Sequence, residues 1–130
     1  MQLEALALRH GPVAPCREDY RIEPNGVLNL LPLLDRLACE PDAAYGAALF
    51  HATLVAGLGE WLQHAAQQES LRAVVLNGGC FMNGVLLQSL SAELQVAGID
   101  VHVAQRLPPN DGGLSLGQAW VGIAALAASM

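Results

Sequence analysis

The sequence predicts an α/β fold in which a mixed sheet packs against helices. One observation behind this is a strand, a glycine-containing loop and a helix that follow one another twice, over residues 71–98 and again over 99–128. A second is the turn at 24–26, Pro-Asn-Gly, which lies between alternating apolar residues and predicts a hairpin. Two parallel strands, each followed by a helix, place their loops at one edge of the sheet, where folds of this class bind ligands.

Composition and charge indicate one globular domain over residues 1–130. Apolar residues make up 53% of the 130 residues and charged residues 14%, which is enough for a compact core. The net charge of -6, with no long run of Lys or Arg, argues against nucleic-acid binding. Apolar stretches are interrupted too often for a membrane span, and the first residues do not form a secretory signal. The three cysteines contain no CxxC pair, so we expect reduced thiols and a cytoplasmic location.

The first half of the chain is expected to be mainly helical. A helix over residues 1–9 ends at a Gly-Pro pair, and a short helix over 30–37 carries a proline in its first turn. The main packing helix is expected over 42–67, where large apolar residues recur at spacings of three and four. Gly57 and Gly59 lie inside it and would weaken an isolated helix, so a bend or a close helix approach is expected there.

The second half is expected to alternate strands and helices. In order, we expect a strand, a helix, a strand, a loop and a helix at residues 71–76, 83–98, 99–105, 108–113 and 114–128. Asn83 is a suitable N-cap for the first of these helices, and Gly98 ends it. His102 is expected on the exposed side of its strand, His51 is interpreted as a packing or surface residue, and Trp61 and Trp120 are interpreted as core residues.

The first loop begins with Asn77, Gly78 and Gly79, directly after an apolar strand. Two glycines before a helix let the backbone approach a ligand with no Cβ in the way. They also present N–H groups and the positive end of the helix dipole to an anion. The alternative is an ordinary tight turn. Asn83 has two possible roles as well, as a helix cap or as a nucleotide contact.

The second loop, "PPNDGG", places Asp111 before another pair of glycines at the equivalent point of the next strand-loop-helix unit. The two prolines stiffen the approach to the loop. Asp111 is suited to cap the following helix, and it is equally suited to bind a metal if other ligands come from elsewhere. The pattern leaves both interpretations open.

The stretches "VVLNGGCFMNGVLLQSLSAEL" and "VAQRLPPNDGGLSLGQAWVGIAAL" resemble the carboxyl-terminal end of the HypF family. These are the carbamoyltransferases of NiFe-hydrogenase maturation, whose last domain is related to the universal tRNA threonylcarbamoyladenosine enzymes. Weaker similarity runs through "LEALA" and "FHATLVAGL". The resemblance implies an actin-like, two-lobed ATP-binding fold of the sugar-kinase and heat-shock ATPase type. The chain would then be the C-terminal lobe of a larger carbamoyltransferase domain.

The resemblance also implies a site. Its cofactors would be ATP and a divalent metal (Zn, Fe or Mg), with Asp111 as a metal ligand. The residues that would form the nucleotide site lie in the two loops, at Asn77, Gly78, Gly79, Asn83, Asn110 and Gly112. No residue of this chain is assigned a catalytic role.

The activity implied by the resemblance is formation of carbamoyl-adenylate from carbamoyl phosphate and ATP. The carbamoyl group would then pass to the C-terminal cysteine of a partner maturation protein, as the source of the cyanide ligands of the NiFe site. The chain departs from the family at Asn77, where the family usually has Ser, and at Met82 and Gly84, where it usually has Gln and Arg. Its histidines also lack the family's His-x-x-x-His metal pair. We therefore expect the isolated chain to be inactive without the N-terminal lobe of the same enzyme.

Two other functions are compatible with the sequence. The first is a non-catalytic, self-associating interaction module that keeps half of a nucleotide-binding fold, with a homodimer formed by swapping the first helix. The second is a stand-alone thiol or phosphate enzyme. Cys80, after the glycine pair, would be its nucleophile, but no histidine lies nearby in the sequence to act as its base.

Overall fold

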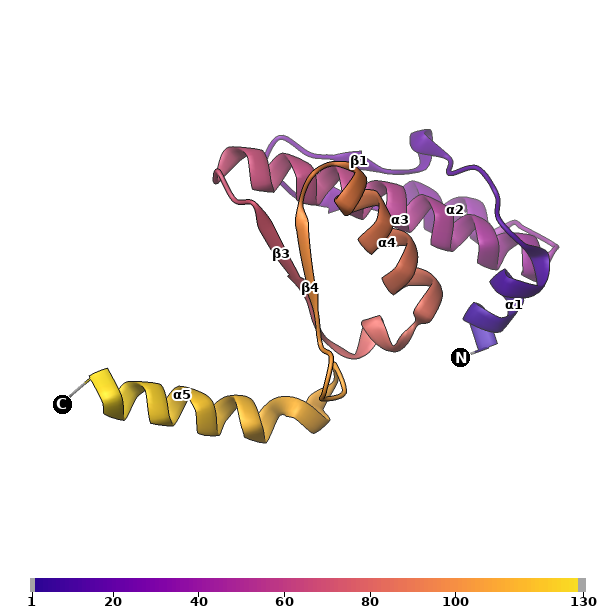
Figure 1. The fold of residues 1–130 in the computed structure, drawn as a ribbon. Coiled ribbons are helices and arrows are strands. Elements are labelled where there is room, and N and C mark those ends of the chain that lie inside the picture. The colour runs from indigo at the N-terminus through magenta and orange to yellow at the C-terminus, as the bar shows by residue number, and fades with distance from the viewer. Residues whose placement is uncertain (1, 129–130) are drawn as a thin grey trace.

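The computed structural model describes residues 2–128 and has an α/β architecture (Figure 1). The helices are α1 (Gln2–His10), α2 (Leu31–Ala38), α3 (Ala43–Gln68), α4 (Gly84–Val96) and α5 (Leu114–Ala128). The strands are β1 (Arg21–Ile22), β2 (Leu28–Asn29), β3 (Ala73–Leu76) and β4 (Asp100–Val103). Three short 3-10 turns complete the chain, η1 (Arg17–Asp19), η2 (Gly79–Met82) and η3 (Asp111–Gly113). The predicted order of elements is confirmed.

Helix α3 is the central element against which the other parts pack. It starts at Asp42, whose Oδ1 accepts hydrogen bonds from Ala44 N at 2.9 Å and Tyr45 N at 3.1 Å. Helices α1 and α4 both contact it. A Cβ at Gly59 would lie 2.6 Å from Glu93 Oε1 of α4, and one at Gly57 would lie 3.2 Å from the Tyr20 ring. The two glycines inside α3 therefore permit the close approach that the sequence predicts.

Strands β3 and β4 form a parallel pair with Val74 opposite Val101. Helix α4 covers one face of this pair, and the main core lies between α4, α3 and the strands, at Val55, Ala66, Leu76, Leu86, Leu90, Leu94 and Ile99. The other face is uncovered in the part of the chain that the structure describes: Val75 is 70% exposed, and His102 is exposed as predicted.

The predicted mixed sheet is wrong. Strands β1 and β2 pair antiparallel in a hairpin of their own, so the described residues form two separate two-stranded sheets. The physical reason is that the hairpin packs on α3 instead of extending the β3–β4 pair. Trp61 of α3 holds the hairpin against the helix, because its Nε1 donates a hydrogen bond to Gly26 O at 2.7 Å. Trp61 is half-buried in this contact, so it is only partly a core residue.

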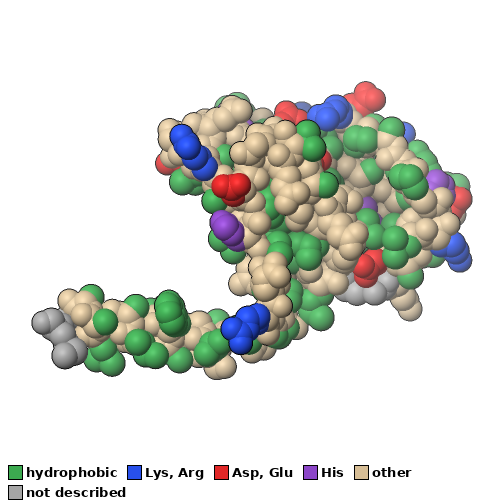
Figure 2. Space-filling model, viewed as in Figure 1, with side chains coloured by type: hydrophobic (Ala, Val, Ile, Leu, Met, Phe, Trp, Pro, Cys, Tyr) green, Lys and Arg blue, Asp and Glu red, His purple; other side chains and the backbone are tan. Residues whose placement is uncertain are grey.

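Helix α5 extends away from the rest of the chain (Figure 1). It is rich in apolar side chains, and Figure 2 shows hydrophobic groups along its surface. Trp120 is 73% exposed, so the prediction that it belongs to the core is wrong. Its helical spacing among aliphatic residues is typical of a buried helix, but within residues 2–128 the main contact of α5 is with η3. No helix among the described residues is both long and apolar enough to cross a membrane.

Candidate functional site

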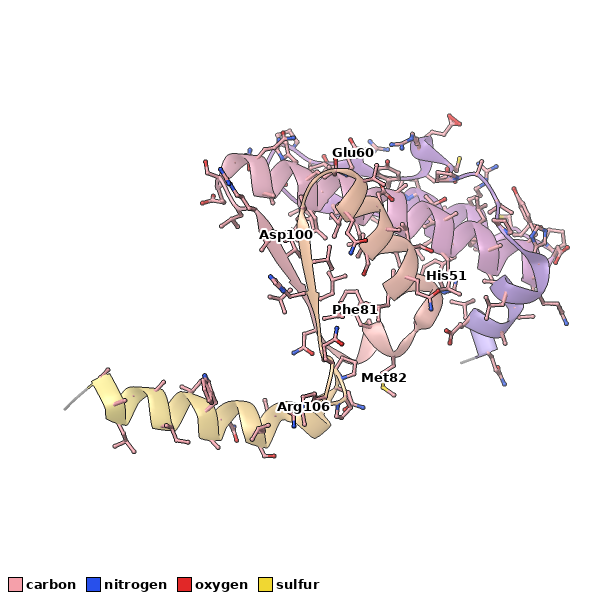
Figure 3. All side chains as sticks on the ribbon, in the orientation of Figure 1. His51, Glu60, Phe81, Met82, Asp100 and Arg106 are labelled. Atoms are coloured by element: carbon pink, nitrogen blue, oxygen red, sulfur yellow. The ribbon has the colours of Figure 1, made fainter. Side chains whose placement is uncertain are left out.

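The two glycine loops meet at the carboxyl ends of β3 and β4. Because the two strands are parallel neighbours, both loops leave the sheet at the same edge. Gly78 N donates to Pro109 O at 2.6 Å, and Asn110 Nδ2 lies 3.2 Å from Met82 Sδ. Figure 3 shows Met82 and Arg106 at this end of the strands. The loops therefore converge as the sequence predicts.

A groove of about 800 Å³ runs beside the loops, between the uncovered face of the β3–β4 pair and α5. Four of the predicted site residues line it, namely Asn77, Gly78, Asn110 and Asp111. Gly79, Asn83 and Gly112 belong to the same loops but do not line the groove. The rest of the lining comes from strand residues such as Val75 and His102, and from the first turns of α5.

Gly78 has a backbone conformation that other residues rarely adopt, with φ at 108° and ψ at 163°. A Cβ built at Gly78 or at Gly79 would meet no atom within 4 Å, so the space beside both glycines is open. Gly79 starts η2, and the first N–H groups of a helical turn have no partner within the turn. This part of the loop therefore combines open space beside the backbone with the N-terminal N–H groups of a short helical turn.

Asn83 is a buried helix cap, with 6% of its surface exposed. Its Oδ1 accepts from Leu86 N at 3.1 Å, and its Nδ2 lies 2.7 Å from His51 Nε2. His51 Nδ1 in turn lies 2.7 Å from Ala47 O. Of the two roles that the sequence left open for Asn83, the structure shows the helix cap, and the nucleotide contact stays a prediction. Sequence reasoning interpreted His51 as a packing or surface residue and did not find its contact with a loop residue 32 positions away.

The N-terminus of α4 already has a negative partner. Glu4 Oε1 of α1 accepts a hydrogen bond from Gly84 N at 2.7 Å, and this bond lowers the pKa of the Glu4 carboxyl. The expectation that the positive end of this helix is open to a ligand anion is therefore wrong. The N–H groups that remain for a ligand belong to the loop before the helix, around Gly79 and Cys80. The Cys80 thiol is exposed and unoxidised.

In the second loop the cap is Asn110, whose Oδ1 accepts from Gly112 N at 3.0 Å. Asp111 does not cap η3, and its side chain is exposed at the groove. Among residues 2–128, no cluster of three or more His, Cys, Asp or Glu is placed to hold a metal ion. Asp111 can thus supply one carboxylate ligand, but the described residues do not form a metal centre by themselves.

The chain matches one family model over residues 1–118, described as the carbamoyltransferase, Kae1-like domain, second subdomain. Among curated proteins, it is 49% identical over 104 residues to carbamoyltransferase HypF2 of Cupriavidus necator, covering 80% of this chain and 13% of that protein. It is 42% identical over 128 residues to the carbamoyltransferase HypF homolog of the same organism, covering 92% of this chain and 32% of that protein. The chain therefore spans a third or less of the length of these relatives.

Solved structures of HypF proteins also resemble this chain. The crystal structure of full-length HypF in the phosphate- and nucleotide-bound form superimposes with a TM-score of 0.80 and 27% identity, covering 96% of this chain and 17% of that one. The crystal structure of T. kodakarensis HypF superimposes with a TM-score of 0.75 over 98% of this chain and 17% of that one. At 23% identity this second match shows a shared fold alone.

Proposed function

The chain belongs to the HypF carbamoyltransferase family, and from this premise we propose that it forms one side of that enzyme's nucleotide site. In this proposal it is the second lobe of an actin-like ATPase fold, and the N-terminal lobe and domains of the same enzyme are its partner. The complete enzyme would act in the cytoplasm. Its substrates would be carbamoyl phosphate, ATP and the C-terminal cysteine of a hydrogenase maturation protein.

The observation that carries the proposal is the contact between the two glycine loops. The hydrogen bond from Gly78 N to Pro109 O joins them at the mouth of a groove with a volume typical of small-molecule sites. The space beside Gly78 and Gly79 is open, and backbone N–H groups and amide side chains such as that of Asn110, which lines the groove, recognise phosphate oxygens and nucleotide polar atoms. The strand residues that line the rest of the groove are mainly apolar, such as Val75 and Val103.

The residues of this chain would bind and orient the nucleotide. Backbone N–H groups at Gly79 and Cys80 would hold phosphate oxygens without side-chain reorganisation, because the loop is fixed at both of its ends. Bound ATP supplies the adenylyl group that activates the carbamoyl carbon. Asp111 would contribute a single ligand to a divalent metal (Zn, Fe or Mg), whose other ligands would come from outside this chain. Positioning, not proton transfer, is therefore the contribution we assign to this lobe.

Reconstitution tests this proposal. The chain would be mixed with the separately produced amino-terminal remainder of the Cupriavidus necator HypF2 relative, and carbamoyl-phosphate-dependent release of pyrophosphate from ATP would be measured. We expect release from the mixture and none from either part alone. Asp111→Asn should reduce it at least tenfold, whereas Asp100→Asn, on an exposed strand position away from the loops, should not. A folded mixture that binds no ATP would refute the proposal.

A second candidate function, the self-associating interaction module, is favoured by one observation. Helix α5 carries six large, more than half-exposed apolar side chains, at Leu114, Leu116, Trp120, Val121, Ile123 and Leu126. A helix that is apolar on all sides is normally buried. Light scattering at micromolar concentrations separates the two candidates: the module predicts a dimer or larger species, whose size falls when residues after 113 are removed.

A further inference from the structure

A continuous chain of hydrogen bonds runs from the N-terminal part of α3 to the start of α4. It passes from Ala47 O to His51 Nδ1 at 2.7 Å, from His51 Nε2 to Asn83 Nδ2 at 2.7 Å, and from Asn83 Oδ1 to Leu86 N at 3.1 Å. His51 is 3% exposed and Asn83 6% exposed. Figure 3 shows His51 directed from α3 toward the segment that leads into α4. Two buried polar side chains therefore link two helices far apart in the sequence.

The partners in this chain fix its direction. Because Leu86 N is a donor, it requires the oxygen of the Asn83 amide, and the Asn83 NH₂ group must then face His51. His51 Nε2 accepts that hydrogen bond, and Nδ1–H donates to the Ala47 carbonyl. Neutral His51 with its proton on Nδ1 is the form that satisfies every atom. Removing the acceptor at position 51 would leave a buried Asn83 N–H without a partner, which is costly.

Asn83 is also the point at which the first loop ends. Its backbone N donates to Cys80 O at 3.1 Å and closes η2, while its backbone O accepts from Leu87 N at 3.0 Å and opens α4. The other end of the loop is held by the hydrogen bond from Gly78 N to Pro109 O. The segment between these two anchors contains Gly79 and Cys80, the first residues of η2, and the space beside Gly79 is open.

We infer that His51 is a positioning residue, which fixes the orientation of the 78–83 loop by holding the amide of Asn83. Its importance for nucleotide binding rests on the proposed function, but its effect on the loop does not. His51 does not line the groove beside the loops, so it acts through Asn83 and not by contact with a ligand. A histidine that only filled space would be replaceable by an apolar side chain of similar volume without an effect on the loop.

Amide hydrogen exchange of the full chain tests this inference without any ligand. His51→Leu keeps the volume and removes the acceptor, whereas His51→Gln keeps an acceptor within reach of Asn83. We expect His51→Leu to raise exchange rates at residues 81–86, where Phe81, Asn83 and Leu86 donate to Gly78 O, Cys80 O and Asn83 Oδ1, about tenfold more than at the hairpin amide of Glu23, which donates to Val27 O. His51→Gln should restore most of the protection.

A double-variant cycle tests the route through Asn83. Asn83→Ser keeps a cap oxygen but removes the NH₂ group, so adding His51→Leu should cause no further increase in exchange at 81–86. If His51→Leu raises exchange equally with and without the Asn83→Ser substitution, or raises it evenly over the molecule, the inference is overturned. In the reconstituted enzyme, His51→Leu should raise the KM for ATP about tenfold and His51→Gln should reverse this. Altered loop exchange with no ATP binding by the unsubstituted mixture would instead refute the proposed function and leave the inference standing.

Discussion

Replacing Gly78 by Ala should destabilise the chain through the backbone alone. A Cβ at this position would meet no atom within 4 Å, so a steric clash is excluded as a cause. The φ of 108° and ψ of 163° place Gly78 in a region that is essentially restricted to glycine. Holding a non-glycine residue there costs of order 1–3 kcal/mol. Gly79 is the matched control, because it also has open space around it and its φ is not in the positive region.

Urea and thermal unfolding followed by circular dichroism measure the difference between the two variants. For 130 residues the entropy of unfolding is about 0.27 kcal/mol/K, so a loss of 1–3 kcal/mol lowers Tm by roughly 4–11 °C. Gly79→Ala should change Tm by less than about 2 °C. If the loop relieves the strain locally, Tm falls less, but the amide at position 78 loses its bond to Pro109 O and exchanges faster. The reasoning is refuted if Gly78→Ala matches Gly79→Ala in both stability and exchange.

Three further predictions concern the body that supports the loops. Leu94→Ala removes a fully buried side chain beneath β3 and β4 and should cost about 2–5 kcal/mol in urea unfolding, whereas Val96→Ala, at a 91% exposed position, should stay within about 0.5 kcal/mol. Asp42→Ala removes the cap of α3 and should cost about 1 kcal/mol, with Asp42→Asn close to neutral by the same measurement. Burial raises the pKa of the Glu93 carboxyl above its usual 4.5, and nearby Glu60 adds to this rise. Glu93→Gln should therefore raise Tm at pH 7. The gain should disappear below pH 4.5, because there the carboxyl is protonated in both the folded and the unfolded chain. A gain in Tm that persists at pH 3 would contradict this cause.

Local patterns were sufficient to predict the elements of this fold and the edge at which the loops meet. Parallel pairing of β3 and β4 follows from two successive strand-helix units, and it brings the loops together without any long-range information. The hairpin at 24–26 was predicted from turn chemistry alone. Its failure to join the other strands was not predictable, because its packing on α3 depends on contacts such as that of Trp61 with Gly26.

The parts of the site that sequence reasoning missed depend on pairs of residues far apart in the chain. Glu4 meets Gly84 N across 80 positions, and His51 meets Asn83 across 32. Neither pair has a characteristic spacing, because α1 and α3 reach the start of α4 through tertiary packing. Sequence reasoning left Asp111 open between a helix cap and a metal ligand, and it did not identify Asn110 as the cap of η3, because neighbouring Asn and Asp have nearly equal capping preferences.

The position of α5 connects the two candidate functions. The helix starts at Leu114, directly after η3, and its first turns line the same groove as Asp111, so a surface that moved α5 would change the width of the groove. Burial of each exposed leucine, isoleucine or valine on α5 would contribute about 1.5–3 kcal/mol. Burial of several of them would be enough to shift the position of α5 relative to the groove. If the groove binds nucleotide as proposed, that binding and the coverage of α5 are thermodynamically linked. The coupling is reciprocal: association through α5 strengthens nucleotide binding by the same factor by which nucleotide strengthens that association. An association constant that saturating ATP leaves unchanged would therefore show that the groove and α5 are not coupled.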